Sequence, residues 1–438
     1  MSLPDTLEGW LARLERQHPV AIDLGLERVE QVARRLGLLD MPIAERVITV
    51  AGTNGKGSTV AMLEALARAH GLSSAAYTSP HLLRYNERLH LDGEEVSDEA
   101  LVQAFMRIEE ARGDISLSYF EAGTLAALLI IAARHPQLAI LEVGLGGRLD
   151  AVNVIAADVA VVTTIAHDHA AFLGNDLETI GREKAGIMRA GRRVVLGSAQ
   201  LPDSVRAHAA SLPVALCRQL GTDYGRDRAA NGWQWWGHDS SGAALTLASL
   251  PDPGLPLDNA ATALQAFLLA DYLPAETHVR EALAEVRLPG RMQWLGRWCL
   301  DVAHNPHAAG YVAARLAERP PRHRVALLGM LGDKDASGVV AALSPAIDAW
   351  VVATLEGDRA RPARELAGHV RAAGGNVLFE ASSPREGARW LDARYKAAGQ
   401  ADDDAEILVC GSFFTVADVL DYLAAGSTAC VEGCQEEE

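Results

Sequence analysis

VAGTNGKGST, at residues 50–59, lies between an apolar run at 47–51 and a stretch from Ser58 onward whose apolar residues have helical spacing. This pattern predicts a buried strand, a glycine-rich turn and a helix. The glycines allow backbone N–H groups to face an anion at the helix N-terminus, where the helix dipole also favours negative charge. The stretch is therefore predicted to bind phosphate groups.

The spacing of this loop differs from that of the usual phosphate loop. Only two residues lie between Gly52 and Gly55, where the usual loop has four, and a further glycine follows Lys56. We expect Lys56 to reach the β- and γ-phosphates of a nucleotide, and Ser58 or Thr59 to place a hydroxyl group near magnesium. The alternative is a glycine-rich turn with a solvated lysine.

Length and composition are those of a large enzyme. The chain has 438 residues, of which 49% are hydrophobic, and this is enough for two domains. No secretory signal or membrane-spanning run is found, and the apolar run at 125–133 is short enough to be a core helix. The five scattered cysteines favour a reducing compartment, so we expect a cytoplasmic protein. The net charge of −17 disfavours nucleic-acid binding, so anionic substrates would need local positive charge.

Predicted strands and helices alternate along most of the chain, which favours α/β layers with parallel sheets. A tryptophan-rich stretch at 216–254 is more irregular and could hold short antiparallel strands. The strands are predicted at 47–51, 139–143, 159–165, 194–197, 298–302, 325–330, 350–355, 376–380 and 407–410.

We therefore expect an α/β fold with two domains. The first, at 1–287, would be an ATP-binding domain of the P-loop ATPase type with a mostly parallel sheet. A linker at 288–296 would follow, because proline and glycine interrupt the pattern there. A smaller Rossmann-like domain would occupy 297–425. The tail at 426–438, which contains Cys430 and Cys434, is predicted to be disordered rather than a metal site.

Glu142 ends one predicted strand and precedes a glycine-rich loop. It should therefore lie at the carboxyl edge of the sheet, where ligands bind in α/β folds. A carboxylate beside a phosphate loop is a candidate magnesium ligand. The alternative is a glutamate that caps the strand or pairs with Arg148.

The sequence His167-Asp168-His169 follows another predicted strand and should reach the same edge. One of the histidines could join a metal site, although a surface loop with hydrogen-bonded histidines is an equal alternative. Lys184 by itself is an ordinary helix lysine. If it were buried beside metal ions, its positive charge would be costly and would have to change.

A similar arrangement is predicted in the second domain, where DVAHNPH at 301–307 follows a strand. Pro306 suits the first turn of a helix, so Asp301, His304 and the helix N-terminus should lie together and could face a nucleotide. The alternative is an Asn-Pro helix cap without further function.

These motifs occur in the order found in the folylpolyglutamate synthase family, which is related to the Mur peptidoglycan ligases. The chain resembles the bifunctional bacterial members of that family from about residue 23 to about residue 416. The matching stretches are VAGTNGKGST, TSPHLLRYNER, EVGLGGRLDAVN, DHAAFLG, GREKAGI, LPGRMQ, DVAHNPHA, GMLGDKD and VCGSFFTV.

The resemblance implies an ATP-dependent amide ligase. Such enzymes phosphorylate a substrate carboxylate, and the α-amine of an amino acid then attacks the acyl phosphate. The implied catalytic residues are Lys56, Lys184 and His304. The implied ATP-binding residues are Asn54, Gly55, Lys56, Gly57, Ser58, Thr59, Asn259, Arg291 and Asp301.

The resemblance also implies a magnesium site and a pterin site. Two Mg²⁺ ions are expected, with a monovalent cation such as K⁺ as a further candidate, and Lys184 would be a carbamate that offers oxygen to magnesium. The implied metal ligands are Ser58, Ser79, Glu142, His169 and Lys184. The implied pterin or folate contacts are Asp23, Leu24, Gly25, Leu26, Tyr119, Phe120, Glu121, Leu149, Asp150 and Ala151. From the residues alone, Tyr119 and Phe120 would be core packing.

The expected partners are small molecules: ATP, L-glutamate, dihydropteroate and reduced folates. We expect a monomer that binds neither nucleic acid nor membranes. Glutamate addition to reduced folates alone is one alternative. A Mur-type amino-acid ligase is another, although the 51 residues before Gly52 are too few for its usual first domain. A regulatory ATP-binding protein would leave Lys184 and the cluster at Asp301 without a purpose.

Overall fold

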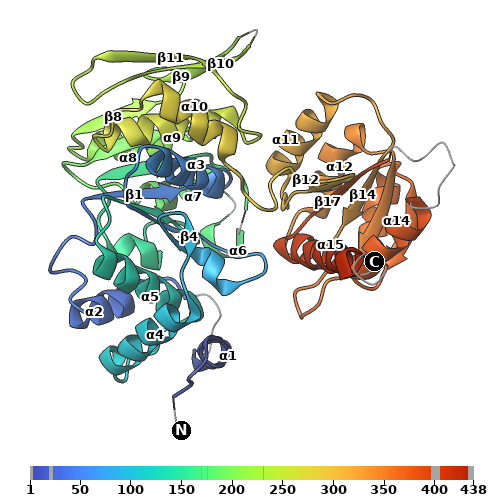
Figure 1. Ribbon diagram of the computed structural model, residues 1–438, viewed down its shortest axis with the longest axis horizontal. Helices are drawn as coiled ribbons and strands as arrows, with labels where there is room; N and C mark the ends of the chain where they lie inside the picture. The colour runs from blue at the N-terminus through green and yellow to red at the C-terminus, as the bar shows by residue number, and fades with distance from the viewer. Residues whose placement is uncertain are drawn as a thin grey trace. The chain divides into compact units, whose positions relative to one another are not determined.

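The computed structural model describes residues 3–18, 23–168, 170–174, 176–229, 231–395 and 405–432. The chain divides into two units, Met1–Arg287 and Leu288–Glu438. In each unit, helices cover both faces of a mostly parallel sheet (Figure 1). The predicted α/β fold class is confirmed.

The phosphate-loop sequence follows the central strand of the first sheet. The strand order is β4-β3-β2-β5-β1-β6-β7-β8, and all neighbours are parallel except β3 and β4 at one edge. Because β1 lies between β5 and β6 and is covered on both faces, it is mostly apolar, and every residue after Arg46 is buried. The strands are β1 (Arg46–Ala51), β2 (Ser74–Tyr77), β3 (Leu89–Leu91), β4 (Glu94–Glu95), β5 (Leu138–Glu142), β6 (Val159–Val162), β7 (Arg193–Leu196) and β8 (Leu216–Gln219).

Helices cover the two faces of this sheet in separate groups. One face packs against α1, α2, α4 and α5 near β1, β2 and β5, and against α7 and α8 near β6 and β7. The helix α3, which begins at the phosphate loop, packs with α9 and α10. The helices are α1 (Leu7–Gln17), α2 (Glu27–Arg35), α3 (Lys56–Ala69), η1 (Tyr85–Arg88), α4 (Asp98–Arg112), α5 (Tyr119–Arg134), η2 (Ala151–Val154), α6 (Ala170–Leu173), α7 (Leu177–Ala185), α8 (Asp203–Ser211), α9 (Leu257–Leu269) and α10 (Glu276–Glu285).

The tryptophan-rich stretch forms a small antiparallel sheet that packs against α9 and α10 (Figure 1). Its strands are β9 (Gly225–Ala229), β10 (Gly232–His238) and β11 (Ala244–Leu250). Trp233 and Trp235 are buried, and their indole N–H groups donate to the carbonyl oxygens of Pro251 (2.8 Å) and Ala261 (3.2 Å). The expected antiparallel strands are therefore present, but the start of the stretch forms β8 and joins the large parallel sheet instead.

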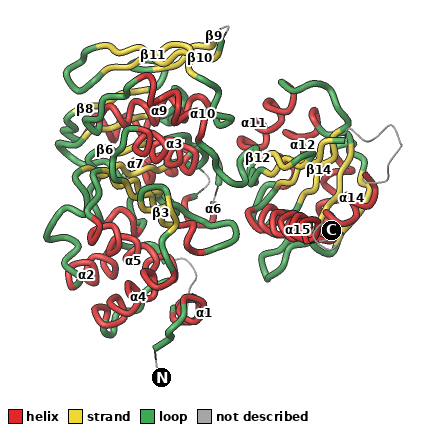
Figure 2. Tube along the Cα trace, viewed as in Figure 1, coloured by secondary structure: helices red, strands yellow, loops and turns green. Residues whose placement is uncertain are grey.

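The second unit has a sheet with the order β12-β13-β17-β14-β15-β16, parallel except for β12. Figure 2 shows its strands between red helices, with α11 and α12 on one side and α14 and α15 on the other. The strands are β12 (Gln293–Leu295), β13 (Trp298–Leu300), β14 (Arg324–Leu328), β15 (Ala349–Ala353), β16 (Val377–Ala381) and β17 (Glu406–Cys410). The helices are α11 (Pro306–Ala317), α12 (Ala336–Leu343), η3 (Ser344–Ala346), α13 (Ala363–Ala372), α14 (Pro384–Tyr395) and α15 (Phe413–Glu432).

Two segments of this unit differ from the prediction. Strand β12 lies inside the predicted linker at 288–296, because Gly296 adopts a left-handed φ of 59° and turns the chain back onto β13. Helix α15 continues to Glu432, beyond the predicted domain end at 425, since no proline and only one glycine, Gly426, interrupts it. Residues 433–438 lie outside the described part of the chain, so a disordered end there stays a prediction.

Within the residues that the structure describes, the helices lack the combination of length and hydropathy that a membrane-spanning segment requires.

Candidate functional site

The phosphate loop has a backbone that only glycine fits at two positions. Gly55 caps the N-terminus of α3 with a left-handed φ of 88°, and an added Cβ there would lie 2.8 Å from the Asn259 amide group. An added Cβ on Gly52 would lie 1.8 Å from the Thr163 hydroxyl oxygen. The loop therefore turns tightly and leads directly into the helix N-terminus, an arrangement suited to anion binding.

Side chains from two other elements hold the loop in place. Thr163 and Thr164, which follow β6, donate hydroxyl hydrogen bonds to the Asn54 carbonyl oxygen (2.7 and 3.0 Å). Asn259, near the start of α9, donates from Nδ2 to Ser58 Oγ (2.7 Å). Sequence reasoning missed the two threonines, since a hydroxyl residue after a strand is a weak signal and they lie about a hundred residues from the loop.

The charged end of Lys56 folds back over the loop. Its Nζ donates to the carbonyl oxygens of Gly52 (3.0 Å) and Thr53 (3.3 Å). The hydroxyl groups of Ser58 and Thr59 both donate to the Gly55 carbonyl oxygen. Lys56 thus lies beside the glycines, where phosphate oxygens would be bound.

A second lysine converges on the same carbonyl group. Lys184, on α7, is only 5% exposed, and its Nζ donates to the Gly52 carbonyl oxygen (3.0 Å). Burial, together with the charge of Lys56, lowers the pKa of Lys184 to about 7, although Asp168 and Asp150 oppose the shift. The predicted cost of a buried cation is therefore present, and near neutral pH a large fraction of the amine is unprotonated.

Ser79 and Glu142 meet at the carboxyl edge of the sheet. Ser79 follows β2, and Glu142 is the last residue of its parallel neighbour β5. The backbone N–H of Ser79 donates to Glu142 Oε2 (3.4 Å). Arg148 forms an ion pair with Glu183 (2.9 Å) in α7. Glu142 lies beside a serine and near the phosphate loop.

Of the two histidines considered for the metal site, His169 lies outside the described residues, and His167 is exposed. In the described part of the chain, no group of three or more His, Cys, Asp or Glu side chains is placed to hold a metal ion. The expected set differs from such a group, because it also uses serine hydroxyls and a modified lysine.

The loop that follows β5 is held by Asp150. Its two carboxylate oxygens accept hydrogen bonds from the backbone N–H groups of Leu145 (2.8 Å) and Val152 (3.0 Å). Burial raises the pKa of Asp150 to about 6, although these N–H groups lower it. An added Cβ on Gly147 would lie 2.7 Å from the Glu183 carbonyl oxygen, so the loop packs directly on α7.

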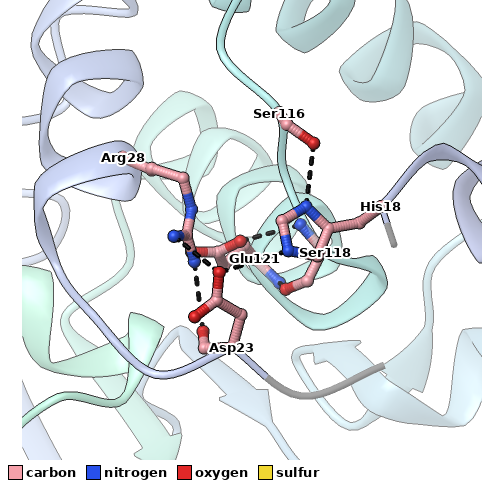
Figure 3. Close-up of polar contacts among 6 residues, drawn as sticks. All are labelled: His18, Asp23, Arg28, Ser116, Ser118 and Glu121. Atoms are coloured by element: carbon pink, nitrogen blue, oxygen red, sulfur yellow. Dashed lines mark hydrogen bonds and ion pairs between the residues drawn. The ribbon is translucent and has the colours of Figure 1, made fainter. Parts of the chain in front are cut away.

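The three predicted pterin segments lie close together. The Gly25 N–H donates to the Leu149 carbonyl oxygen (3.3 Å), which joins the segment at 23–26 to the segment at 149–151. Arg28, at the start of α2, pairs with both Asp23 (2.7 Å) and Glu121 (2.8 Å), as Figure 3 shows. Arg28 was not singled out from the sequence, where it reads as one more charged residue of an amphipathic helix.

Glu121 has more than one structural role. It completes a capping box at the start of α5, in which its Oε2 accepts from the Ser118 N–H (2.7 Å). Its other oxygen, Oε1, accepts from Arg28. Both oxygens of this buried carboxylate are therefore engaged, and Asp23 is the more accessible of the two acids.

The two aromatic residues before Glu121 differ in their surroundings. Tyr119 lies edge-on to Tyr85 (5.8 Å between ring centroids), and the Arg88 guanidinium lies over both rings. Phe120 packs against Gly144, where an added Cβ would be 2.5 Å from the ring. Packing thus explains Phe120 well, while Tyr119 lies at the edge of the core.

The predicted cluster of the second unit is also assembled. Asp301 accepts from the Met292 N–H (2.9 Å) and the Ala303 N–H (2.8 Å), and burial raises its pKa while the Arg291 charge opposes the shift. His304 Nδ1 donates to the Val302 carbonyl oxygen (2.9 Å). The Asn-Pro cap is present as well, because Asn305 Oδ1 accepts from the Ala308 N–H.

Phe413 lies close to both Arg291 and His304, and sequence analysis did not identify it as a site residue. Its ring lies 5.1 Å from the Arg291 guanidinium and 6.4 Å from the His304 ring. The motif GSFFTV was noted only as a family stretch, and an aromatic residue at the start of a helix gives no functional signal by itself.

Two domain families match the chain in the positions that the fold suggests. Residues 50–199 match the Mur ligase middle domain, and residues 290–413 match the glutamate ligase domain of Mur ligases. Fold and site together define a protein of the Mur ligase class.

Full-length relatives narrow the class. The chain is 44% identical to the dihydrofolate synthase/folylpolyglutamate synthase of Escherichia coli over 96% of both chains, and 40% identical to that of Haemophilus influenzae over 94% of this chain and 96% of the relative. A structure of E. coli FolC with DHPP and ADP has a TM-score of 0.89 at 42% identity and covers 98% of this chain and 100% of the other. A structure of a bifunctional folylpolyglutamate synthase/dihydrofolate synthase with Mn, AMPPNP and L-glutamate has a TM-score of 0.86 at 42% identity and covers 97% of this chain and 100% of the other. The chain belongs to the dihydrofolate synthase/folylpolyglutamate synthase family.

Proposed function

We propose that this chain is an ATP-dependent ligase that joins L-glutamate to dihydropteroate and adds further glutamates to reduced folates. The observation that carries the proposal is the meeting of the phosphate loop, the Ser79–Glu142 pair and Lys184 at one edge of a parallel sheet. The relatives support it, because their structures contain ADP, AMPPNP, Mn and L-glutamate.

The proposed reaction has two steps. A carboxylate oxygen of the pterin substrate attacks the γ-phosphorus of ATP, and ADP leaves. The unprotonated α-amine of L-glutamate then attacks the acyl carbon, an amide bond forms, and inorganic phosphate leaves while the nitrogen loses a proton to water. Lys56 would neutralise charge on the transferred phosphoryl group in the first step.

The proposed nucleotide contacts are those that the family resemblance implies. Gly55, Gly57 and the N-terminus of α3 would bind phosphate oxygens through backbone N–H groups. Arg291, Asp301 and His304 keep the roles that the family resemblance gives them. The remaining proposed contacts are Asn54, Lys56, Ser58, Thr59 and Asn259.

The donor atoms at the carboxyl edge fit magnesium, because Ser79 and Glu142 offer hard oxygen ligands side by side. We propose two Mg²⁺ ions, held by these two residues, Ser58, His169 and carbamylated Lys184; K⁺ stays a candidate. Bound magnesium would neutralise the phosphates and orient the γ-phosphoryl group. The unprotonated fraction of Lys184 is the form that reacts with carbon dioxide.

For the pterin ring we propose the surface formed by the segments at 23–26, 119–121 and 149–151. The exocyclic amine and ring N–H groups of a pterin are hydrogen-bond donors that suit a carboxylate. Asp23 is the accessible carboxylate of this surface. Tyr119 offers a flat partner at the edge of the core. The monomeric state and the cytoplasmic location remain predictions.

Phosphate release by the purified chain with MgATP tests the function. We expect release only when dihydropteroate and L-glutamate are both present. Release with ATP alone would contradict the ligase and favour a regulatory ATPase. A parallel reaction with tetrahydrofolate and L-glutamate separates the remaining alternative, because activity in that reaction only would leave a folylpolyglutamate synthase.

A further inference from the structure

His18 connects one segment of the proposed pterin surface, at 23–26, to the loop that leads into another. It follows α1, its side chain is only 8% exposed, and its two ring nitrogens face different partners (Figure 3). Nδ1 lies 2.8 Å from Ser116 Oγ, in the loop before α5, and Nε2 lies 3.2 Å from Asp23 Oδ2. The imidazole thus joins two segments that are about a hundred residues apart in sequence.

The direction of one hydrogen bond follows from its partner. A carboxylate only accepts, so Nε2 carries a hydrogen atom and donates to Asp23. In the neutral ring Nδ1 then accepts from the Ser116 hydroxyl group, and in the charged ring it donates to the same oxygen. The contact with Asp23 persists in both forms, so it does not depend on the charge of the ring.

Asp23 is held on one side only. Its Oδ2 receives both His18 Nε2 and Arg28 Nη1, and Arg28 also donates to the Asp23 carbonyl oxygen (3.2 Å). The side chain nevertheless keeps 36% of its surface exposed. Two donors therefore fix the orientation of the carboxylate and leave it able to accept hydrogen bonds from a ligand.

We infer that His18 is a positioning residue for the pterin substrate, which rests on the proposed function. It orients the Asp23 carboxylate toward the pterin N–H groups and, through Ser116, sets the segment at 23–26 against the loop that leads into α5. Arg28 provides a positive charge beside the Asp23 carboxylate, while His18 provides a second hydrogen-bond donor that stops the carboxylate from rotating.

A role restricted to anchoring α1 is the competing explanation. That helix already has an apolar anchor, because Leu7, Trp10 and Leu14 are buried and the Trp10 ring stacks on Phe105 (5.9 Å). Arg13 adds an ion pair to Glu109 in α4. Loss of the His18 contacts should therefore leave α1 in place.

The test compares three variants of the full chain. His18→Leu removes both polar contacts, whereas His18→Gln keeps one donor and one acceptor at similar positions. Arg13→Ala is the matched control, because it weakens the attachment of α1 without touching the pterin segments. The KM for dihydropteroate, the KM for ATP, kcat and the melting temperature are measured for each.

We expect His18→Leu to raise the KM for dihydropteroate about tenfold, as for a lost hydrogen bond to a charged group, with the KM for ATP unchanged. His18→Gln should recover most of this loss, and Arg13→Ala should leave both KM values unchanged. An unchanged KM for dihydropteroate in His18→Leu would overturn the inference, as would equal rises in both KM values or an equal effect of Arg13→Ala.

A second variant keeps the test decisive if His18→Leu fails to fold. Ser116→Ala removes only the Nδ1 partner, so we expect a several-fold rise in the KM for dihydropteroate alone, and no rise would again overturn the inference. Tetrahydrofolate replaces dihydropteroate if only the former is a substrate. A wild-type chain that uses neither pterin refutes the proposed function itself, and with it the inference.

Discussion

Gly55 and Gly71 flank the same helix with similar backbone angles but different surroundings. Their φ values are 88° and 68°, both in the left-handed region that favours glycine. An added Cβ on Gly55 would collide with the Asn259 amide group, whereas one on Gly71 would meet nothing within 4 Å. Substitution of Gly71 therefore introduces backbone strain alone, whereas substitution of Gly55 introduces the same strain and also disrupts the phosphate loop.

We predict that Gly55→Ala abolishes measurable ATP binding, while Gly71→Ala leaves ATP affinity unchanged. Both variants should lose about 1–2 kcal/mol of folding stability, because both force an L-residue into the left-handed region. Calorimetric titration with MgATP and thermal melting measure the two effects. Equal ATP affinity in both variants would mean that the loop does not bind the nucleotide.

Lys184 permits a test of its chemical state. We predict that Lys184→Ala lowers kcat about 100-fold or more, since the proposed metal ligand is lost, and that a short carboxylate such as formate restores part of the rate. Lys184→Arg keeps a cation but cannot form the carbamate, so formate should not rescue it. Carbon-13 NMR with labelled bicarbonate should show a carbamate signal in the wild type only; a signal in Lys184→Arg would assign it elsewhere.

At the level of strands, burial determined what could be predicted from the sequence. β1, β5 and β14 are mostly apolar and lie between parallel neighbours, so their positions follow from the pattern. β2 reads Ser-Ala-Ala-Tyr and lacks the branched residues that signal a strand, so only its pairing with β5 makes it one. β12 was not predicted, because the proline and glycine just before it indicate a linker rather than a strand.

A buried ionic group joins the start of two strands in the second unit. Glu406, at the start of β17, pairs with Arg324 of β14 (2.8 Å) and with Arg319 (3.0 Å), and Arg319 stacks over Trp294 of β12. Glu406 and Arg324 are both buried, so removal of the carboxylate leaves a buried cation without its partner.

We predict that Glu406→Ala destabilises the second unit by about 3 kcal/mol. Glu380→Ala is the matched control, because Glu380 of β16 pairs with Arg371 (2.7 Å) at an exposed position and should cost less than about 0.5 kcal/mol. Native-state hydrogen exchange of the β14 and β17 amides reads the local free energy of opening. Similar losses in both variants would show that the buried group adds no particular stability.

Across the chain, the residues that the sequence could identify are those attached to regular patterns. Glu142 and Asp301 end or follow apolar strands, and Lys56 stands in a glycine loop, so their positions could be predicted. The contacts of His18 with Ser116, and of Arg28 with Glu121, join residues 98 and 93 positions apart and leave no local trace. The sequence therefore indicates which residues could carry the chemistry of the site, but not the contacts that support them.

An acyl-phosphate intermediate separates the proposed ligase from a regulatory ATP-binding protein. Its formation links the carboxylate of the pterin substrate covalently to the γ-phosphoryl group, and glutamate attack then leaves that carboxylate oxygen on phosphate. The reaction is therefore run with dihydropteroate labelled with oxygen-18 in its carboxylate, and the inorganic phosphate is analysed by mass spectrometry. We predict one labelled oxygen in each phosphate released; unlabelled phosphate formed together with dihydrofolate would contradict the proposed mechanism.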